Sequence, residues 1–85
     1  MNRSIIKSPP PGDFEEISIE ILGWQEKFMK LVQQGKRIKY EVYTMPNLSK
    51  AIQDELSKQG YCDFQLEDTD WHFLVPRSGK QLTTP

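Results

Sequence analysis

Glycines and prolines divide this 85-residue sequence into short segments, and within each segment the apolar residues recur either at every second position or at helical spacing. None of the five glycines or six prolines falls inside a periodic segment, so each marks a boundary between elements. A chain of this length has room for one domain with a small core. The periodicity should therefore give the order of the elements in a single small domain.

Alternation with a period of two predicts a strand in residues 14–22 and a second strand in residues 37–43. Both segments are rich in β-branched or aromatic residues, which favour strands. The positions that share the apolar face are Ile17, Ile19 and Ile21 in the first segment and Ile38, Tyr40 and Val42 in the second.

Helical spacing predicts an amphipathic helix after each of these strands. The first apolar stripe consists of Trp24, Phe28, Leu31 and Val32, and the second of Leu48, Ala51, Ile52 and Leu56. Gly35 and Gly60 are placed to end the two helices in the left-handed conformation. Asn47 is a favourable N-cap for the second helix.

The last periodic segments, residues 62–66 and 71–75, predict a hairpin around an acidic turn. The expected register sets Phe64 opposite Phe73 and Cys62 opposite Val75, so that apolar side chains meet apolar side chains. In this interpretation His72 lies on the other, solvent-facing side of the hairpin.

The element order is therefore β-α-β-α-β-β. Because strand-helix-strand crossovers are right-handed, both helices should pack on one face of the sheet. We expect an α+β protein: a two-layer α/β sandwich with two helices on one face of a four-stranded mixed sheet. Whether the last strand lies inside the sheet or at its edge stays open.

The predicted domain spans residues 13–76. Residues 1–12 end in three successive prolines and predict a flexible, extended Pro-rich arm. Residues 77–85 predict a disordered polar tail. Removing either segment is then expected to leave the melting temperature nearly unchanged.

The sequence contains neither a secretory leader pattern nor an apolar stretch long enough for a membrane span. We therefore expect a cytoplasmic protein that does not insert into membranes and whose single cysteine, Cys62, is reduced.

The inventory of reactive residues argues against catalysis. Cys62 and the single histidine, His72, fall on opposite faces of the predicted hairpin, so strand parity forbids a thiol–imidazole pair. No glycine-rich phosphate loop is present. We expect no enzymatic activity, no cofactor and no metal site. Asp68 and Asp70 favour a solvated acidic turn, although divalent cation binding there stays an open alternative.

Charge is distributed by segment: residues 13–23 and 42–76 are acidic, whereas residues 24–41 are basic, and the formal net charge is only -1. Such a bipolar domain suits a charged partner or weak self-association. With helices on one face only, the other sheet face should be exposed. The binding residues expected on that face are Arg37, Lys39, Tyr43, Gln65, His72 and Leu74.

These features favour a small non-enzymatic binding, adaptor or regulatory module that contacts a protein partner through the exposed sheet face. The alternative is an RNA or single-stranded DNA binding protein that uses the basic segment of the first helix and second strand. Its candidate residues are Lys27, Lys30, Lys36, Arg37 and Lys39.

The element order is similar to that of the carboxy-terminal domain of bacterial translation initiation factor three, of the Alba chromatin proteins and of small sulfur-relay proteins. The resemblance covers topology alone, and no motif of these families accompanies it. The sulfur-relay resemblance implies an exposed cysteine beside the first helix, whereas Cys62 lies in the third predicted strand.

Overall fold

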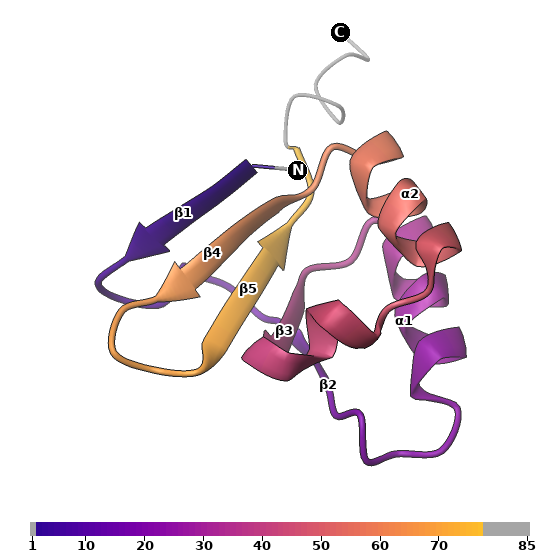
Figure 1. The fold of residues 1–85 in the computed structure, drawn as a ribbon. Coiled ribbons are helices and arrows are strands. Elements are labelled where there is room, and N and C mark those ends of the chain that lie inside the picture. Colours follow the sequence, from indigo (N-terminus) through magenta and orange to yellow (C-terminus); the bar gives the residue numbers. More distant parts are fainter. Residues whose placement is uncertain (1, 78–85) are drawn as a thin grey trace, which may run out of the picture.

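The computed structural model describes residues 2–77 and contains five strands, two α-helices and one 3-10 helix (Figure 1). The strands are β1 (Asn2–Ile6), β2 (Glu15–Ile17), β3 (Ile38–Glu41), β4 (Cys62–Leu66) and β5 (Trp71–Val75). The helices are α1 (Trp24–Gln33), the 3-10 helix η1 (Val42–Asn47) and α2 (Lys50–Lys58). Of the predicted polar tail, residues 78–85 lie outside the described part of the chain.

The strands form one mixed sheet in the order β1-β4-β5-β3-β2. β5 lies between β3 and β4 and is antiparallel to both, so β3 and β4 are parallel to each other. β2 and β1 form the two edges, each parallel to its neighbour. The crossovers through α1 and α2 therefore join parallel strands, as expected, and the last strand lies inside the sheet.

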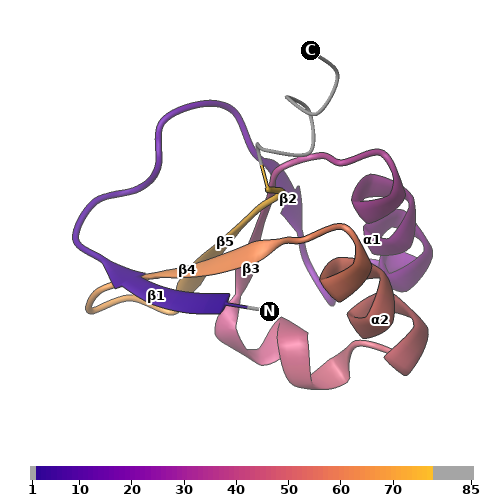
Figure 2. The same cartoon turned by 90° about the horizontal axis from the view of Figure 1, so that it is seen from above.

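The two α-helices lie together on one side of the sheet, while the connection from β1 to β2 arches over the other side (Figure 2). This arrangement confirms the two-layer α/β sandwich. We call the face that packs against the helices the inner face and the opposite one the outer face. Because side chains alternate along a strand, each strand residue belongs to one face or the other.

The sheet has five strands, whereas the sequence predicts four. The additional strand is β1, which lies within the segment expected to be an extended arm. Its residues pair with β4 from Asn2 opposite Cys62 to Ile6 opposite Leu66. The sequence of this segment has no period-two pattern from which a strand could be predicted. It lies along β4, whose backbone groups would otherwise form an open edge.

The helices match their predicted positions closely. α1 buries Phe28, Leu31 and Val32 against the sheet, and α2 buries Ile52 and Leu56. Gly35 and Gly60 follow the two helices with φ of 69° and 74°, the left-handed conformation expected at these ends.

The N-cap of α2 is Ser49 rather than Asn47. The Ser49 hydroxyl accepts a hydrogen bond from the backbone N–H of Ile52, at 3.3 Å. Asn47 instead belongs to η1, where its side-chain amide donates to the carbonyl oxygen of Tyr43 at 2.7 Å. The two residues Leu48 and Ser49 separate η1 from α2.

Two predicted strands are shorter in the structure. β2 ends at Ile17, because the Ser18 carbonyl and hydroxyl accept hydrogen bonds from the following backbone and start a turn. Ile21 then lies on the surface, with 61% of its area exposed. β3 ends at Glu41, and the next residues coil into η1, which leaves Tyr43 exposed.

The main core lies between the inner face and the helices. Its buried members are Ile17, Phe28, Leu31, Val32, Ile38, Tyr40, Leu48, Ile52, Leu56, Tyr61 and Leu74. Burying one large apolar side chain of this kind contributes roughly 1.5–3 kcal/mol. The core therefore holds the sheet, α1 and α2 in a fixed arrangement, against which both surfaces described below are positioned.

Candidate functional site

The predicted register of the hairpin is confirmed, but its orientation is inverted. Phe64 lies opposite Phe73 and Cys62 opposite Val75, as expected. The face formed by these four residues is the outer face, whereas Asp63, His72 and Leu74 face the helices. Leu74 is 0% and His72 is 4% exposed, so both are buried on the side of the helices and neither belongs to the exposed sheet face expected from the sequence.

The reason for the inversion lies in the neighbouring strand. β5 pairs with β3 so that Leu74 is opposite Ile38 and His72 is opposite Tyr40. Ile38 and Tyr40 carry the core on β3, and partners across a sheet share a face. The hairpin therefore turns its less apolar side toward the helices and its more apolar side outward.

The expected binding residues are divided between the two faces and η1. Arg37 and Lys39 lie on the outer face, as predicted. Tyr43 is exposed, but it lies in η1 beyond the end of β3. Gln65 faces inward beside His72 and is half-buried. The structure thus brings together only Arg37 and Lys39 from the predicted set on the helix-free face.

The five cations of the nucleic-acid alternative are also divided. Lys27 and Lys30 are exposed on α1, on one side of the sheet, and Lys36 follows that helix. Arg37 and Lys39 lie on the outer face. On that face Lys39 is flanked by the carboxylates of Glu16, its partner on β2, and Glu41, two residues along β3.

The outer face carries a strip of apolar side chains over its central strands. The strip consists of Ile6, Cys62, Phe64, Leu66, Trp71, Phe73 and Val75. Phe73 is buried and the other six are half-buried, although no helix of residues 2–77 covers this side. We refer to these seven residues as the outer strip.

Part of the outer strip is covered by the connection between β1 and β2. The ring of Phe14 meets Phe73 edge to face, with centroids 5.0 Å apart. The Arg37 guanidinium lies 4.5 Å from the centroid of the Phe14 ring, and Gly12 abuts the same guanidinium. Gly12 has φ of 106°, so a side chain there would be both strained and obstructed.

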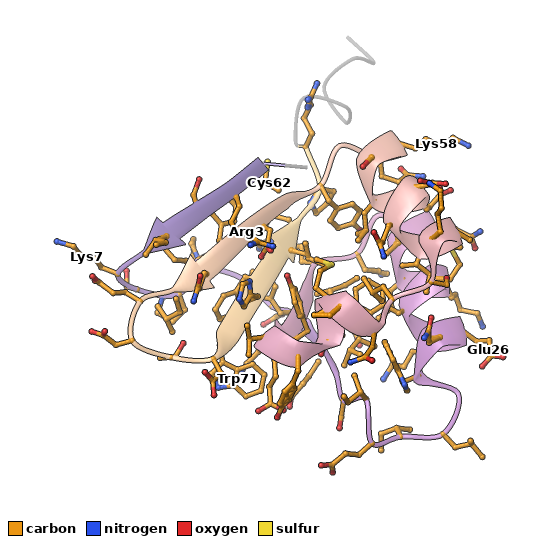
Figure 3. The ribbon with its side chains drawn as sticks, viewed as in Figure 1. Arg3, Lys7, Glu26, Lys58, Cys62 and Trp71 are labelled. Atoms are coloured by element: carbon orange, nitrogen blue, oxygen red, sulfur yellow. The ribbon has the colours of Figure 1, made fainter. Side chains whose placement is uncertain are left out.

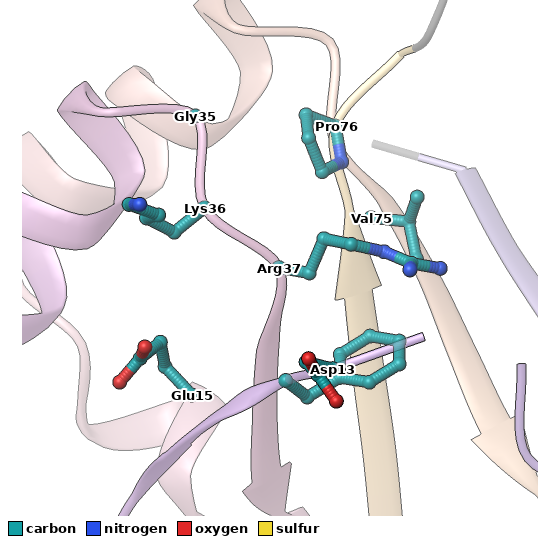
Figure 4. Close-up of a pocket in the computed structure, with 8 residues that line it drawn as sticks. Asp13, Glu15, Gly35, Lys36, Arg37, Val75 and Pro76 are labelled. Carbon is teal, nitrogen blue, oxygen red and sulfur yellow. The ribbon is translucent and has the colours of Figure 1, made fainter. Parts of the chain in front are cut away.

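A hollow of about 550 Å³ opens beside this stack, at the end of the sheet where β2 and β3 begin and β5 ends (Figure 4). Arg37 is directed toward Val75, whereas Lys36 and Glu15 are directed away from them. The hollow extends the outer face by a recess with both acidic and basic groups.

On the inner face, Asp63 and His72 form a buried polar pair that the sequence analysis missed. Nδ1 of His72 lies 2.9 Å from Oδ1 of Asp63, and the Asp63 side chain is fully buried. Arg3 reaches from β1 across β4, so that its Nε lies 3.4 Å from Oδ2 of Asp63 (Figure 3). The expectation of a surface imidazole is therefore wrong.

Two further features mark this pair. Burial, with the added negative charge of Asp63, raises the pKa of Tyr40, so the adjacent phenol stays protonated. Nε2 of His72 is buried and has no hydrogen-bond partner.

The sequence could have indicated this Asp63–His72 pair through the predicted hairpin register. That register places Asp63 diagonally across from His72 on the same face of the hairpin.

Cys62 lies on the outer face and His72 on the inner face, which confirms the predicted separation of the thiol from the imidazole. Within residues 2–77 no three histidine, cysteine, aspartate or glutamate side chains are grouped so that they could hold a metal ion. In the same residues no helix has the length and apolar character needed to span a membrane.

Comparison with known proteins finds no matching family model, no matching curated protein and no matching solved structure.

Proposed function

We propose that this protein is a small binding module that contacts a protein partner through its outer face, without catalysing a reaction there. The observation that carries the proposal is the outer strip. It places aromatic and aliphatic side chains on a sheet face that no helix of the described chain covers. Apolar surface of this kind on a sheet is typical of an interaction site.

The composition of the face fits a protein partner. Aromatic residues and arginine are enriched at the centres of protein interfaces. Trp71 lies at one end of the outer strip with Nζ of Lys39 at 4.6 Å from its ring centroid, and Arg37 lies on Phe14 at the other. A partner with an apolar centre and carboxylates opposite these two cations would match the surface.

The experiment compares partner retention by wild type with that of two variants of the outer face, Phe64→Glu and Lys39→Glu. The matched control is Lys30→Glu, which makes the same charge change on the exposed side of α1. We expect a partner that wild type and Lys30→Glu retain and both outer-face variants lose. Equal retention by all four proteins would contradict the proposal.

The location of the contact can be read independently from backbone amide shifts of isotope-labelled wild type. Fractions of cell extract should perturb Lys39, Phe64 and Phe73 and leave the exposed residues of α1 unchanged. Perturbations confined to α1 and α2 would place the contact on the wrong side of the sheet and would also contradict the proposal.

Binding to single-stranded nucleic acid is the competing outcome. It predicts a mobility shift whose affinity falls steeply with salt, because phosphate contacts release counterions. The carboxylates of Glu16 and Glu41 beside Lys39 disfavour it. Weak self-association through the outer face is a further outcome, and a concentration-dependent sedimentation coefficient that Phe64→Glu abolishes would identify it.

A further inference from the structure

On the opposite side of the sheet from the outer strip, a hollow of about 390 Å³ lies between the inner face, η1 and α2. Its polar wall is formed by Arg3, Gln53, Gln65 and His72. Its apolar wall is formed by η1, through Val42 and Met45. A volume of this size lies at the small end of the range for small-molecule sites.

His72 is the central group of the polar wall. Its Nδ1 is bound to Asp63, which fixes the ring and leaves Nε2 as the remaining polar atom. That Nε2 is buried without a partner, although the ring lines the hollow. An unpaired buried nitrogen is unfavourable in the folded protein, so a ligand atom that pairs with it would remove this cost.

Arg3 supplies a second group at the hollow. Its Nε lies 3.4 Å from Oδ2 of Asp63. The side chain is 61% exposed at the mouth of the hollow. An arginine fork in this position suits a planar carboxylate.

The charges of the hollow decide the kind of ligand. The titratable or charged groups that face the His72 ring are Asp63 from β4, Tyr40 from β3 and Arg3 from β1. η1 and α2 contribute Met45 and Gln53, which carry no charge. Arg3 offsets Asp63 and Tyr40 stays neutral, so an imidazolium at His72 would leave one positive charge to be balanced.

We propose that this hollow binds a small carboxylic acid with a short apolar group, in its carboxylate form. The carboxylate would accept hydrogen bonds from the Nη atoms of Arg3 and from a protonated Nε2 of His72. The apolar group would lie against Val42 and Met45.

The test is a titration of the isotope-labelled protein with hexanoate, with acetate and hexanamide as comparisons. Hexanoate should shift the ring resonances of His72 and the amides of Arg3, Val42 and Gln65. Acetate should bind more weakly because it lacks the apolar group, and hexanamide because it lacks the charge. An acetylated dipeptide ending in leucine distinguishes a free acid, which we propose, from a peptide carboxyl terminus. Equal or tighter binding of the dipeptide would overturn the assignment to a free acid.

Variants locate the site. Arg3→Gln removes the fork, and His72→Asn keeps an amide donor near Asp63 while it deletes the group at Nε2. Each should weaken hexanoate binding by about tenfold or more, the usual effect of losing a charge-assisted hydrogen bond. The matched control is Lys7→Gln, which removes one positive charge from an exposed residue just after β1 and should leave binding unchanged.

Arg3→Gln keeps the test decisive if His72→Asn does not fold, because Arg3 is largely exposed. Absence of shifts at millimolar hexanoate, or equal weakening by Arg3→Gln and Lys7→Gln, would overturn the proposal. Outer-face variants such as Lys39→Glu should bind hexanoate normally, so this site and the outer face can fail separately.

Discussion

Nδ1 of His72 lies 2.9 Å from Oδ1 of Asp63 on the adjacent strand, and both side chains are buried beneath η1 and the helical layer. The two residues are diagonal neighbours in the hairpin, since Asp63 pairs with Leu74 and His72 with Gln65. Each provides a hydrogen-bonding partner that the other needs in order to be buried.

Replacing Asp63 with alanine should therefore be strongly destabilising. We expect Asp63→Ala to lower the free energy of unfolding by about 3 kcal/mol, because it leaves His72 buried without its partner. Asp54→Ala is the matched control, since Asp54 forms an exposed ion pair with Lys50 on α2 and should lose less than about 0.5 kcal/mol. Urea unfolding measures the free energy of unfolding of both variants. Similar losses for Asp63→Ala and Asp54→Ala would show that the buried pair stabilises the fold no more than the exposed ion pair does.

The same pair shows where sequence reasoning was sufficient and where it was not. The register of β4 and β5 followed from matching Phe64 with Phe73, because pairing depends on neighbours within the hairpin. The choice of face depends on a distant strand, since β5 must align Leu74 with Ile38. The amphipathicity of the hairpin alone favours burial of its more apolar side against the helices. In the structure that more apolar side lies on the outer face.

A second buried polar group links stability to pH. Burial raises the pKa of Tyr61 to about 12, above the ordinary tyrosine value of about 10, and its hydroxyl donates to the carbonyl oxygen of Lys36 at 2.5 Å. The folded state thus holds the phenol proton more tightly than the unfolded state. The stability associated with Tyr61 is complete below pH 10 and is lost as the pH rises to about 12.

Tyr61→Phe should remove this contribution. At neutral pH we expect a loss of about 1 kcal/mol, the usual net value of one hydrogen bond. Above pH 10 the variant should lose stability less steeply than wild type. Urea unfolding at neutral pH and at two alkaline pH values checks both parts, and parallel alkaline slopes for the two proteins would contradict the assignment to Tyr61.

β1 shows a different limit of the sequence. Its residues have no alternating pattern, and only Ile5 and Ile6 are apolar, so nothing in residues 2–6 indicates a strand. The strand exists because β4 offers a backbone edge with which a nearby segment can pair. Periodicity detects side-chain burial, and Ile5 is in fact 68% exposed.

From periodicity alone, we expect that removing the residues before Ser8 leaves the melting temperature nearly unchanged. The structure instead predicts that their removal lowers the melting temperature. A chain that starts at Ser8 loses the pairing with β4 and the Arg3–Asp63 ion pair. We expect its melting temperature to fall by about 5 °C or more, which corresponds to roughly 1 kcal/mol in a domain of this size. Arg3→Gln removes only the ion pair and keeps the pairing of β1 with β4. Its melting temperature should therefore fall by less than that of the truncated chain. If the truncated chain has the same melting temperature as wild type, β1 contributes no stability.

The last prediction concerns the cover of the outer strip. Phe14 packs on Phe73 and beneath Arg37, so Phe14→Ala should lower the free energy of unfolding by about 2 kcal/mol. Leu22→Ala is the control, because Leu22 is fully exposed and should change stability by no more than about 0.5 kcal/mol. Phe14→Ala should also increase binding of a hydrophobic dye, since Phe73 loses its cover. If Phe14→Ala is as silent as Leu22→Ala, the contact of the Phe14 ring with Phe73 does not contribute to the stability of the fold.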